Sequence, residues 1–188
     1  MHAAGQLRHG TMAAILGLDS EGVAAACEAG QEVGVVVPAN FNCPGQIVIS
    51  GEVDAVHRAM ETAQEIGAKR AMALQVSGAF HSELMQPAQE PLRIALDEVI
   101  FLQPVVPVVP NVTGASTTDP VELKKLLVDQ IVSPVRWTES MTHLIGLGMG
   151  RALELGPGNT LKSLMRRIDR NVDVTALGSL PDLEGLSN

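Results

Sequence analysis

The stretch Asn42-Cys43-Pro44-Gly45-Gln46-Ile47-Val48-Ile49-Ser50 decides the fold of this chain. A Pro-Gly pair favours a tight turn, because proline presets one backbone angle of the turn and glycine tolerates a positive φ at the next position. The β-branched run 46–50 follows this turn, and a second β-branched run, 33–40, precedes it. The stretch therefore predicts two consecutive strands that form a hairpin-like pair.

The segments on either side of the hairpin complete a known supersecondary order. Residues 21–29 follow an Asp-Ser pair that is typical of a helix N-cap, and a glycine stops them. Apolar residues recur at helical spacing over residues 53–66. Strand-like runs at 11–18 and 69–76 lie outside both helices. The order strand, helix, strand, strand, helix, strand predicts a ferredoxin-like α+β unit over residues 11–76.

The second half of the chain alternates helix and strand. Its apolar periodicity predicts helices over residues 82–99, 120–131, 138–147 and 160–168, and strands over residues 104–111, 151–155 and 172–176. Pro91 should kink or restart the first of these helices. The alternation is typical of a parallel α/β sheet, but two or three strands are few for a doubly wound one. We therefore expect that the chain lacks part of its natural domain.

Composition excludes several classes of function. The formal net charge is −8, and a single short basic run spans residues 166–170, which argues against a nucleic-acid binder but allows a small basic patch for an acidic partner. Cys27 and Cys43 lie far apart, as in a protein of a reducing compartment. No apolar run is long enough for a membrane span, and residues 1–10 lack the apolar core of a signal peptide. We expect a cytoplasmic protein that does not bind membranes.

His81 is the strongest candidate for catalysis. It follows a strand-like run and the small residues Ser77, Gly78 and Ala79, and the first predicted helix of the second half begins directly after it. Such a turn lets a side chain project from the scaffold into a cleft, where a general base would sit. The alternative is an ordinary loop histidine.

Other residue patterns are weaker evidence for a catalytic or binding site. The chain has no Gly-x-Gly-x-x-Gly and no phosphate-binding loop, so no cofactor is predicted, and its five histidines show no metal-ligand spacing. It has no Gly-x-Ser-x-Gly elbow, and Ser77 and Ser82 lie too near His81 in sequence for easy attack geometry. The Gly-Pro-Gly-Asn run at 156–159 precedes a helix and is either an anion-binding N-terminus or a plain turn.

Five motifs occur in an order that resembles one known family. This family is that of malonyl-CoA:acyl carrier protein transacylases, together with the related acyltransferase domains of polyketide synthases, and the resemblance covers essentially the whole chain. The motifs are residues 11–18, 40–51, 76–85, 130–137 and 154–159. The resemblance implies an α/β fold in which residues 77–178 are the C-terminal part of an α/β-hydrolase-like large subdomain. Residues 11–76 are its ferredoxin-like small subdomain, with a connector over 1–10 and a flexible tail over 179–188.

The resemblance also implies a reaction. A serine on an elbow would attack malonyl-CoA, and the malonyl group would then pass to the phosphopantetheine thiol of acyl carrier protein. His81 matches the general base, and Gln130 matches the residue whose backbone carbonyl accepts the second imidazole N–H. Phe80 matches the malonyl-selecting form of the motif. The remaining matches line the substrate cleft: Asn42, Gln46, Gly156 and Gly158.

The chain departs from the family in one respect. The family's elbow serine, its carboxylate-binding arginine and its oxyanion loop precede the segment that matches this chain, so we expect the 188 residues alone to be inactive. One alternative is a non-catalytic module that binds acyl carrier protein or a partner subunit. Another is a serine hydrolase that uses Ser77 or Ser82.

Overall fold

The computed structural model describes residues 4–5 and 8–184. The chain forms two compact units, Met1–Ser140 and Met141–Asn188. Of the connector expected over 1–10, residues 1–3 and 6–7 lie outside the described residues. None of the helices in the described ranges is both long enough and apolar enough to cross a membrane.

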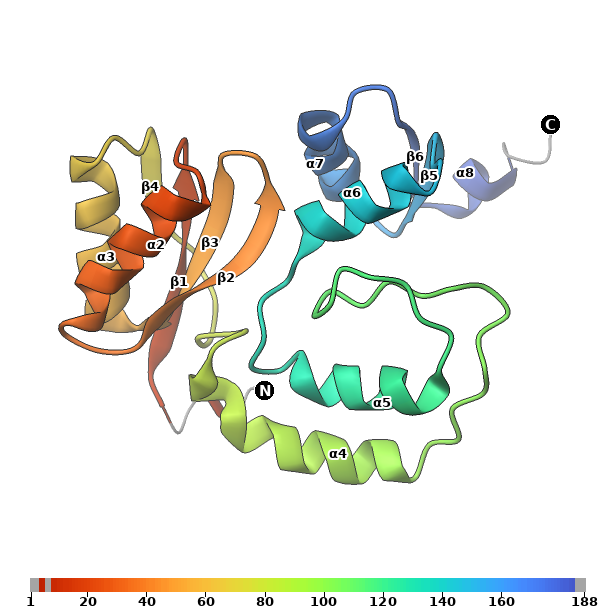
Figure 1. Ribbon diagram of the computed structural model, residues 1–188, viewed down its shortest axis with the longest axis horizontal. Helices are drawn as coiled ribbons and strands as arrows, with labels where there is room; N and C mark the ends of the chain where they lie inside the picture. Colours follow the sequence, from red (N-terminus) through yellow and green to blue (C-terminus); the bar gives the residue numbers. More distant parts are fainter. Residues whose placement is uncertain (1–3, 6–7, 185–188) are drawn as a thin grey trace. The chain divides into compact units, whose positions relative to one another are not determined.

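The first unit is built on a four-stranded antiparallel sheet. Its strands are β1 (Gly10–Leu16), β2 (Val36–Cys43), β3 (Gln46–Glu52) and β4 (Arg70–Ala73), in the spatial order β2-β3-β1-β4. The helices α2 (Ser20–Gln31) and α3 (Val53–Glu65) lie side by side over one face (Figure 1). This order confirms the ferredoxin-like prediction, because each helix connects two strands that have a third strand between them. The hairpin turn is Pro44–Gly45, and Gly45 has a φ of 68°.

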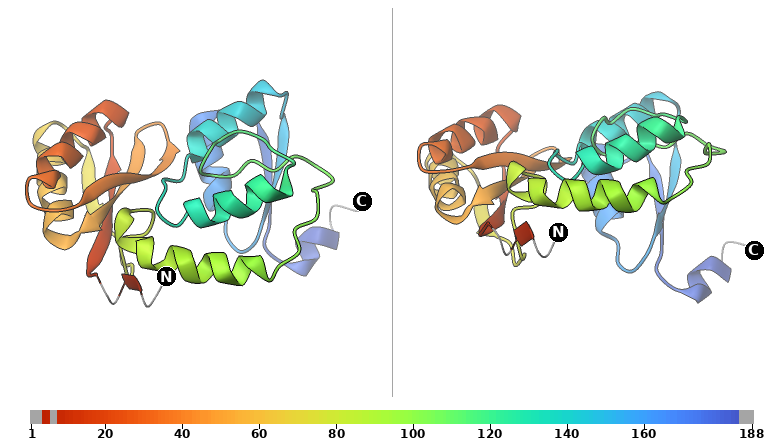
Figure 2. Two further views of the ribbon diagram at one scale, coloured as in Figure 1. Left: turned by 60° about the horizontal axis from the view of Figure 1, so that its bottom comes forward. Right: turned by 90° about the horizontal axis from the view of Figure 1, so that it is seen from below.

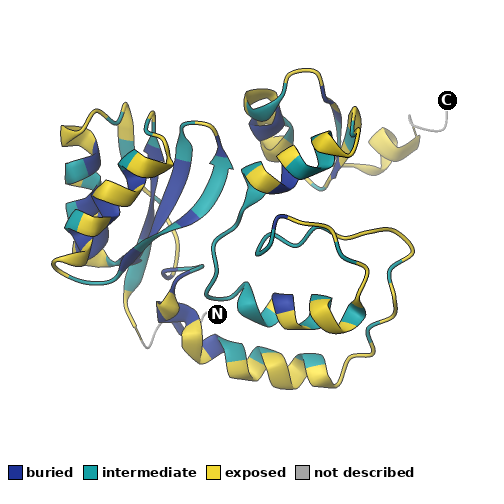
Figure 3. Ribbon diagram, in the orientation of Figure 1, coloured by how far each residue is buried: buried dark blue, intermediate teal, exposed yellow. Residues whose placement is uncertain are grey.

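The main core lies between this sheet and its two helices (Figure 3). Inward-facing Ile15 and Ile49 meet Val23 of α2 and Val56 of α3, and none of the four is exposed. Each such side chain contributes about 1.5–3 kcal/mol through burial. The opposite face carries a smaller apolar cluster of Met12, Ala14, Ala39 and Val48, against which Leu74 and Phe80 pack. Phe80 thereby packs the turn that carries His81 against the sheet.

The helix expected over 82–99 is divided by its prolines. A 3₁₀ helix, η1 (Glu83–Ala88), contains Pro87, and the α-helix α4 (Gln89–Asp97) restarts so that Pro91 lies in its first turn. There the missing proline N–H costs no hydrogen bond. The helix α5 (Pro120–Asp129) runs beside α4 (Figure 2), and the Asp119 side chain caps it by accepting from the Val121 N–H at 2.8 Å.

The strand predicted over residues 104–111 is absent, and this prediction was wrong. In this described segment, Val108 makes an isolated antiparallel bridge to Thr117. Prolines at 104, 107 and 110 remove three backbone donors from the segment, so it cannot sustain a ladder of hydrogen bonds.

The second unit confirms the predicted parallel pairing. The boundary between the units falls inside α6 (Trp137–Gly146). Strands β5 (Arg151–Leu155) and β6 (Asp173–Leu177) pair in parallel, connected through α7 (Thr160–Ile168). Within the tail expected over 179–188, α8 spans Leu180–Glu184, and residues 185–188 lie outside the described part of the chain.

Candidate active site

His81 lies in a tight turn between β4 and η1, and its backbone conformation is unusual. Its φ is 61°, in the left-handed region that costs a non-glycine residue about 1–2 kcal/mol. The Ser82 hydroxyl, on a side chain that is only 1% exposed, donates to the Ala79 carbonyl at 2.7 Å across this turn. The Met85 N–H donates to the Ser82 carbonyl at 3.0 Å and begins η1. A strained residue held by its surroundings is typical of a functional position.

The imidazole of His81 meets the end of α5. Its Nδ1 lies 3.1 Å from the backbone carbonyl oxygen of Gln130, the C-cap residue of that helix. A carbonyl oxygen can only accept, so this contact assigns the proton of neutral His81 to Nδ1 and leaves the lone pair on Nε2. The Gln130 side-chain amide lies 3.4 Å from the same Nδ1, but it donates to the Ser133 carbonyl at 2.8 Å. We therefore assign the carbonyl as the partner of Nδ1.

The segment after Gln130 pairs with the outer edge of β2. The Val135 N–H donates to the Ala39 carbonyl at 2.8 Å, and the Phe41 N–H donates to the Val135 carbonyl at 2.9 Å. The Thr138 hydroxyl donates to the Phe41 carbonyl at 3.0 Å. These hydrogen bonds tie the segment that follows Gln130 to the sheet, and so help to fix the residue that contacts His81. No pattern in the sequence predicts this contact, because an isolated bridge of two hydrogen bonds has no periodic signal.

The structure brings three of the predicted site residues together and leaves four as predictions. His81 contacts Gln130 within the first unit, and Phe80, the residue before His81, packs against the same cluster as Ile131, the residue after Gln130. Asn42 lies half-buried on β2, and the Gln46 side-chain oxygen accepts from the Cys43 thiol at 3.8 Å. A cavity of about 320 Å³ lies beside this hairpin, between Phe41, Cys43 and Thr138. Gly156 and Gly158 belong to the second unit, so their place at the site stays a prediction.

Contacts within the second unit account for the conformation of the turn at 156–159. Gly156 and Gly158 have φ values of 127° and 94°, which few other residues tolerate. The carboxylate of Glu154, 9% exposed, accepts from the backbone N–H groups of Leu161 at 2.8 Å and Lys162 at 2.9 Å. Glu154 thus occupies the N-terminus of α7, which favours the plain turn over an anion-binding site.

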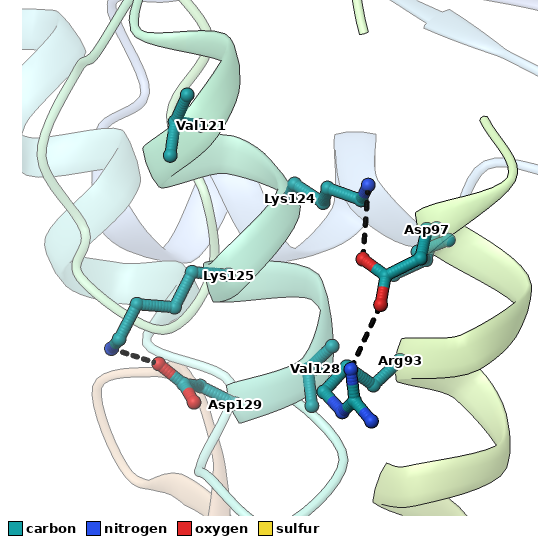
Figure 4. Close-up of a pocket in the computed structure, with 8 residues that line it drawn as sticks. Arg93, Asp97, Val121, Lys124, Lys125, Val128 and Asp129 are labelled. Atoms are coloured by element: carbon teal, nitrogen blue, oxygen red, sulfur yellow. Dashed lines mark hydrogen bonds and ion pairs between the residues drawn. The ribbon is translucent and has the colours of Figure 1, made fainter. Parts of the chain in front are cut away.

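A cavity of about 340 Å³ between α4 and α5 is lined largely by ion-paired side chains (Figure 4). Asp97 accepts from Arg93 at 2.8 Å and lies 3.2 Å from Lys124, and Lys125 pairs with Asp129 at 2.6 Å. The hydrogen bond from Arg93 lowers the pKa of Glu90. The Asp97–Lys124 pair joins α4 to α5, the helix whose C-cap residue Gln130 contacts His81, so we interpret this cavity as part of the scaffold. Within the described residues, no three His, Cys, Asp or Glu side chains gather as metal ligands would.

Comparison with known proteins gives a consistent result. The acyl transferase domain family matches residues 6–182. Malonyl CoA-acyl carrier protein transacylase of Bacillus subtilis is 44% identical over 176 residues, which are 93% of this chain and 56% of that protein. The chain therefore spans about half the length of the curated relatives it matches.

Two solved structures are similar as well. An acyl carrier protein S-malonyltransferase from Vibrio cholerae superposes with a TM-score of 0.90 at 42% identity, covering 94% of this chain and 58% of that one. A malonyl-transacylase in complex with its type II PKS acyl-carrier protein superposes with a TM-score of 0.89 at 40% identity, covering 95% of this chain and 59% of that one. These similarities confirm the predicted fold class.

Proposed function

Because the chain belongs to the acyl transferase domain family, we propose that it serves malonyl transfer from malonyl-CoA to the phosphopantetheine thiol of acyl carrier protein, with His81 as the general base. The observation that carries this proposal is the contact of His81 Nδ1 with the Gln130 carbonyl, because it leaves Nε2 free to accept a proton. A backbone carbonyl thus takes the place that a carboxylate holds in a serine triad.

The proposed reaction has two half-reactions. In the first, Nε2 of His81 takes the proton of a serine hydroxyl as the serine attacks the malonyl thioester, and that proton then leaves on the CoA sulfur. In the second, Nε2 takes the proton of the carrier thiol, the thiolate attacks the serine ester, and the serine regains a proton. The 188 residues contain no Gly-x-Ser-x-Gly elbow. We propose that a segment outside them supplies this serine, on the same chain or on another.

The remaining site residues have proposed roles in binding. Phe80 selects the malonyl group beside the base, and Asn42 and Gln46 line the pantetheine cleft from the hairpin. Gly156 and Gly158 form a turn near the same cleft. We also propose that residues 11–76 act as the small subdomain and residues 77–178 as part of the large one.

The carrier protein requires a docking surface, and the second unit has a basic one. Arg166, Arg167 and Arg170 line a concavity of about 370 Å³ with Ser163. Arginine side chains suit an acidic partner because each presents several donors to carboxylates. We propose this concavity as a contact for an acidic face of the partner.

The test supplies the serine on a second polypeptide. Malonyl transfer to acyl carrier protein is measured with the purified chain alone and with the part of the Bacillus subtilis relative that this chain does not match. We expect no turnover alone, turnover on mixing, and a loss of about 10²- to 10⁴-fold in His81→Ala. His57→Ala, an exposed histidine of α3, is the matched control and should retain activity. Robust turnover by the chain alone would refute the external serine, and a fully active His81→Ala mixture would refute the base.

A second candidate function is a non-catalytic binding module for a partner subunit. The observation that favours it is an exposed apolar segment, residues 100–105, which we call the strap. In it, Ile100, Leu102 and Val105 are each at least 80% exposed. Next to the strap lies an apolar cavity of about 330 Å³ that includes Phe101, Leu126 and Gln130 in its lining. Exposed apolar side chains beside an apolar cavity are typical of an interaction surface.

The strap is tested by its assembly with the same Bacillus subtilis segment. Leu102→Glu should weaken assembly, measured by analytical ultracentrifugation, while the far-UV circular dichroism of the chain stays unchanged. Val33→Glu, exposed elsewhere, is the control and should assemble normally. If Leu102→Glu assembles as well as the unchanged chain, the strap is not the interface.

A further inference from the structure

We propose that Ser82 is a positioning residue, whose buried hydroxyl holds the backbone of His81 in the left-handed conformation that aims Nδ1 at the Gln130 carbonyl. This inference rests on the proposed role of His81 as the base. It assigns to Ser82 a task in setting which imidazole nitrogen carries the proton, rather than a task as nucleophile. Ser82 as a residue is only 1% exposed, and its hydroxyl donates to the Ala79 carbonyl, so it is poorly placed to attack a substrate.

The Ser82 hydroxyl closes the turn that carries His81. The Ser82 hydroxyl reaches back three residues to the Ala79 carbonyl at 2.7 Å and so spans the backbone of His81. Among the described residues that are not glycine, His81 is the one with a positive φ. Such a conformation persists where surrounding contacts over-determine it. The Ser82 hydrogen bond is the side-chain contact that bridges this turn.

Both ends of this hydrogen bond are anchored. Ala79 is fully buried against the start of β1, where a Cβ on Gly10 would lie only 2.6 Å from the Ala79 Cβ. On the other side, Leu84 and Met85 of η1 are fully buried. The turn between these anchors has a fixed span, so the hydroxyl bridge restricts the conformations that His81 can adopt.

The conformation of the turn also sets where the imidazole points. The imidazole reaches the Gln130 carbonyl at 3.1 Å from this backbone conformation. If the turn relaxes, the direction of the His81 side chain changes, and Nδ1 loses its acceptor. Solvation alone then sets the tautomer of the His81 imidazole, and its proton is no longer confined to Nδ1. The position of the base would thus depend on a residue that touches no substrate.

The test reads the His81 tautomer directly in the 188-residue chain. The chain is labelled with ¹⁵N-histidine, and His81→Asn identifies the signal of His81 among the five histidines. In the unchanged chain we expect a protonated Nδ1 and an unprotonated Nε2. In Ser82→Ala we expect the Nε2-protonated form to appear and the Nδ1 proton to exchange about tenfold faster, comparable to the loss of one hydrogen bond.

Ser140→Ala is the matched control. Ser140 is also 1% exposed, and its hydroxyl also donates to a backbone carbonyl, that of Arg136, at 2.9 Å. A merely structural role for buried serines predicts similar destabilisation in both variants and an unchanged tautomer in both. Our proposal predicts a tautomer change in Ser82→Ala and none in Ser140→Ala.

Two results would overturn the proposal: an unchanged His81 tautomer in Ser82→Ala, or equal tautomer changes in both variants. If Ser82→Ala does not fold, Ser82→Cys decides by the same criteria, because its slightly larger thiol leaves no cavity and is only a weak donor. This readout needs no catalytic turnover. Failure of the reconstituted malonyl transfer would therefore contradict the proposed function while leaving the tautomer result intact.

Discussion

Replacement of Glu154 gives the sharpest test of how the second unit is held together. The N-cap residue of α7, Asn159, makes no side-chain cap hydrogen bond, and the Glu154 carboxylate accepts from Leu161 and Lys162 instead. A hydrogen bond to a charged group is worth about 1.5–3 kcal/mol. Two such bonds set an upper bound, but water can reach Leu161, which is 38% exposed. We therefore expect Glu154→Ala to cost about 2–3 kcal/mol, which includes a helix-dipole contribution.

The assay has a global and a local readout. Urea denaturation measures the free energy of unfolding, and hydrogen exchange measures the protection of the Leu161 and Lys162 amides. Glu154→Gln keeps the volume and one acceptor but loses the charge, so it should lose about 1 kcal/mol. Asp173→Asn is the control. Asp173 is an exposed carboxylate on the neighbouring strand, 4.0 Å from Arg151, and its replacement should cost less than about 0.5 kcal/mol. Unchanged exchange at both amides in Glu154→Ala would refute the reasoning.

Five further outcomes follow from individual residues. Gly51→Ala should cost about 3 kcal/mol or more in urea denaturation, because its Cβ would fall on the Val35 carbonyl and 2.6 Å from the Val36 Cα; near-native stability would contradict this. Ser50→Ala should stay within about 0.5 kcal/mol or stabilise the chain, because the Ser50 hydroxyl is buried without a partner among the described atoms. Burial raises the pKa of Cys27 from 9.0 to about 12, so the thiol should resist alkylation at pH 8 until the chain unfolds. The raised pKa favours the protonated folded form, so stability is full below pH 9 and falls by up to about 1.4 kcal/mol per pH unit above it, a slope that Cys27→Ala should remove. A fluorophosphonate probe should label neither Ser77 nor Ser82, and mass spectrometry of labelled peptides would detect either.

The ferredoxin-like unit could be predicted from the sequence because its signals are local. The Pro44–Gly45 turn sets the hairpin, and the apolar spacing over residues 53–66 is helical without reference to any distant residue. The parallel pair of β5 and β6 was likewise predicted from two short apolar runs on either side of a helix. The strand expected over 104–111 does not form. Its β-branched residues favour a strand, but its prolines lack the backbone N–H groups that a ladder of hydrogen bonds needs.

The candidate site was harder to predict, because its geometry depends on residues far apart in sequence. No local pattern pairs His81 with Gln130, and that pairing entered through family resemblance. Histidine is one of the residue types enriched at positive φ, but this preference is too weak to predict that His81 adopts the left-handed conformation. Glu154 is the first residue of the motif at 154–159, but only the folded unit shows that its side chain turns back onto the start of α7.

The hydrogen bond between His81 and Gln130 also has a consequence for synthesis. The two residues are 49 positions apart, and the Thr138 bond to Phe41 spans 97 positions. All strands of the four-stranded sheet lie before His81. At ribosomal rates of about 5–20 residues per second, Gln130 is added about 2–10 s after His81. During that interval, a nascent chain can already fold the sheet, while the histidine has no carbonyl to fix its proton. His81 therefore acquires a defined tautomer only when translation has passed residue 130.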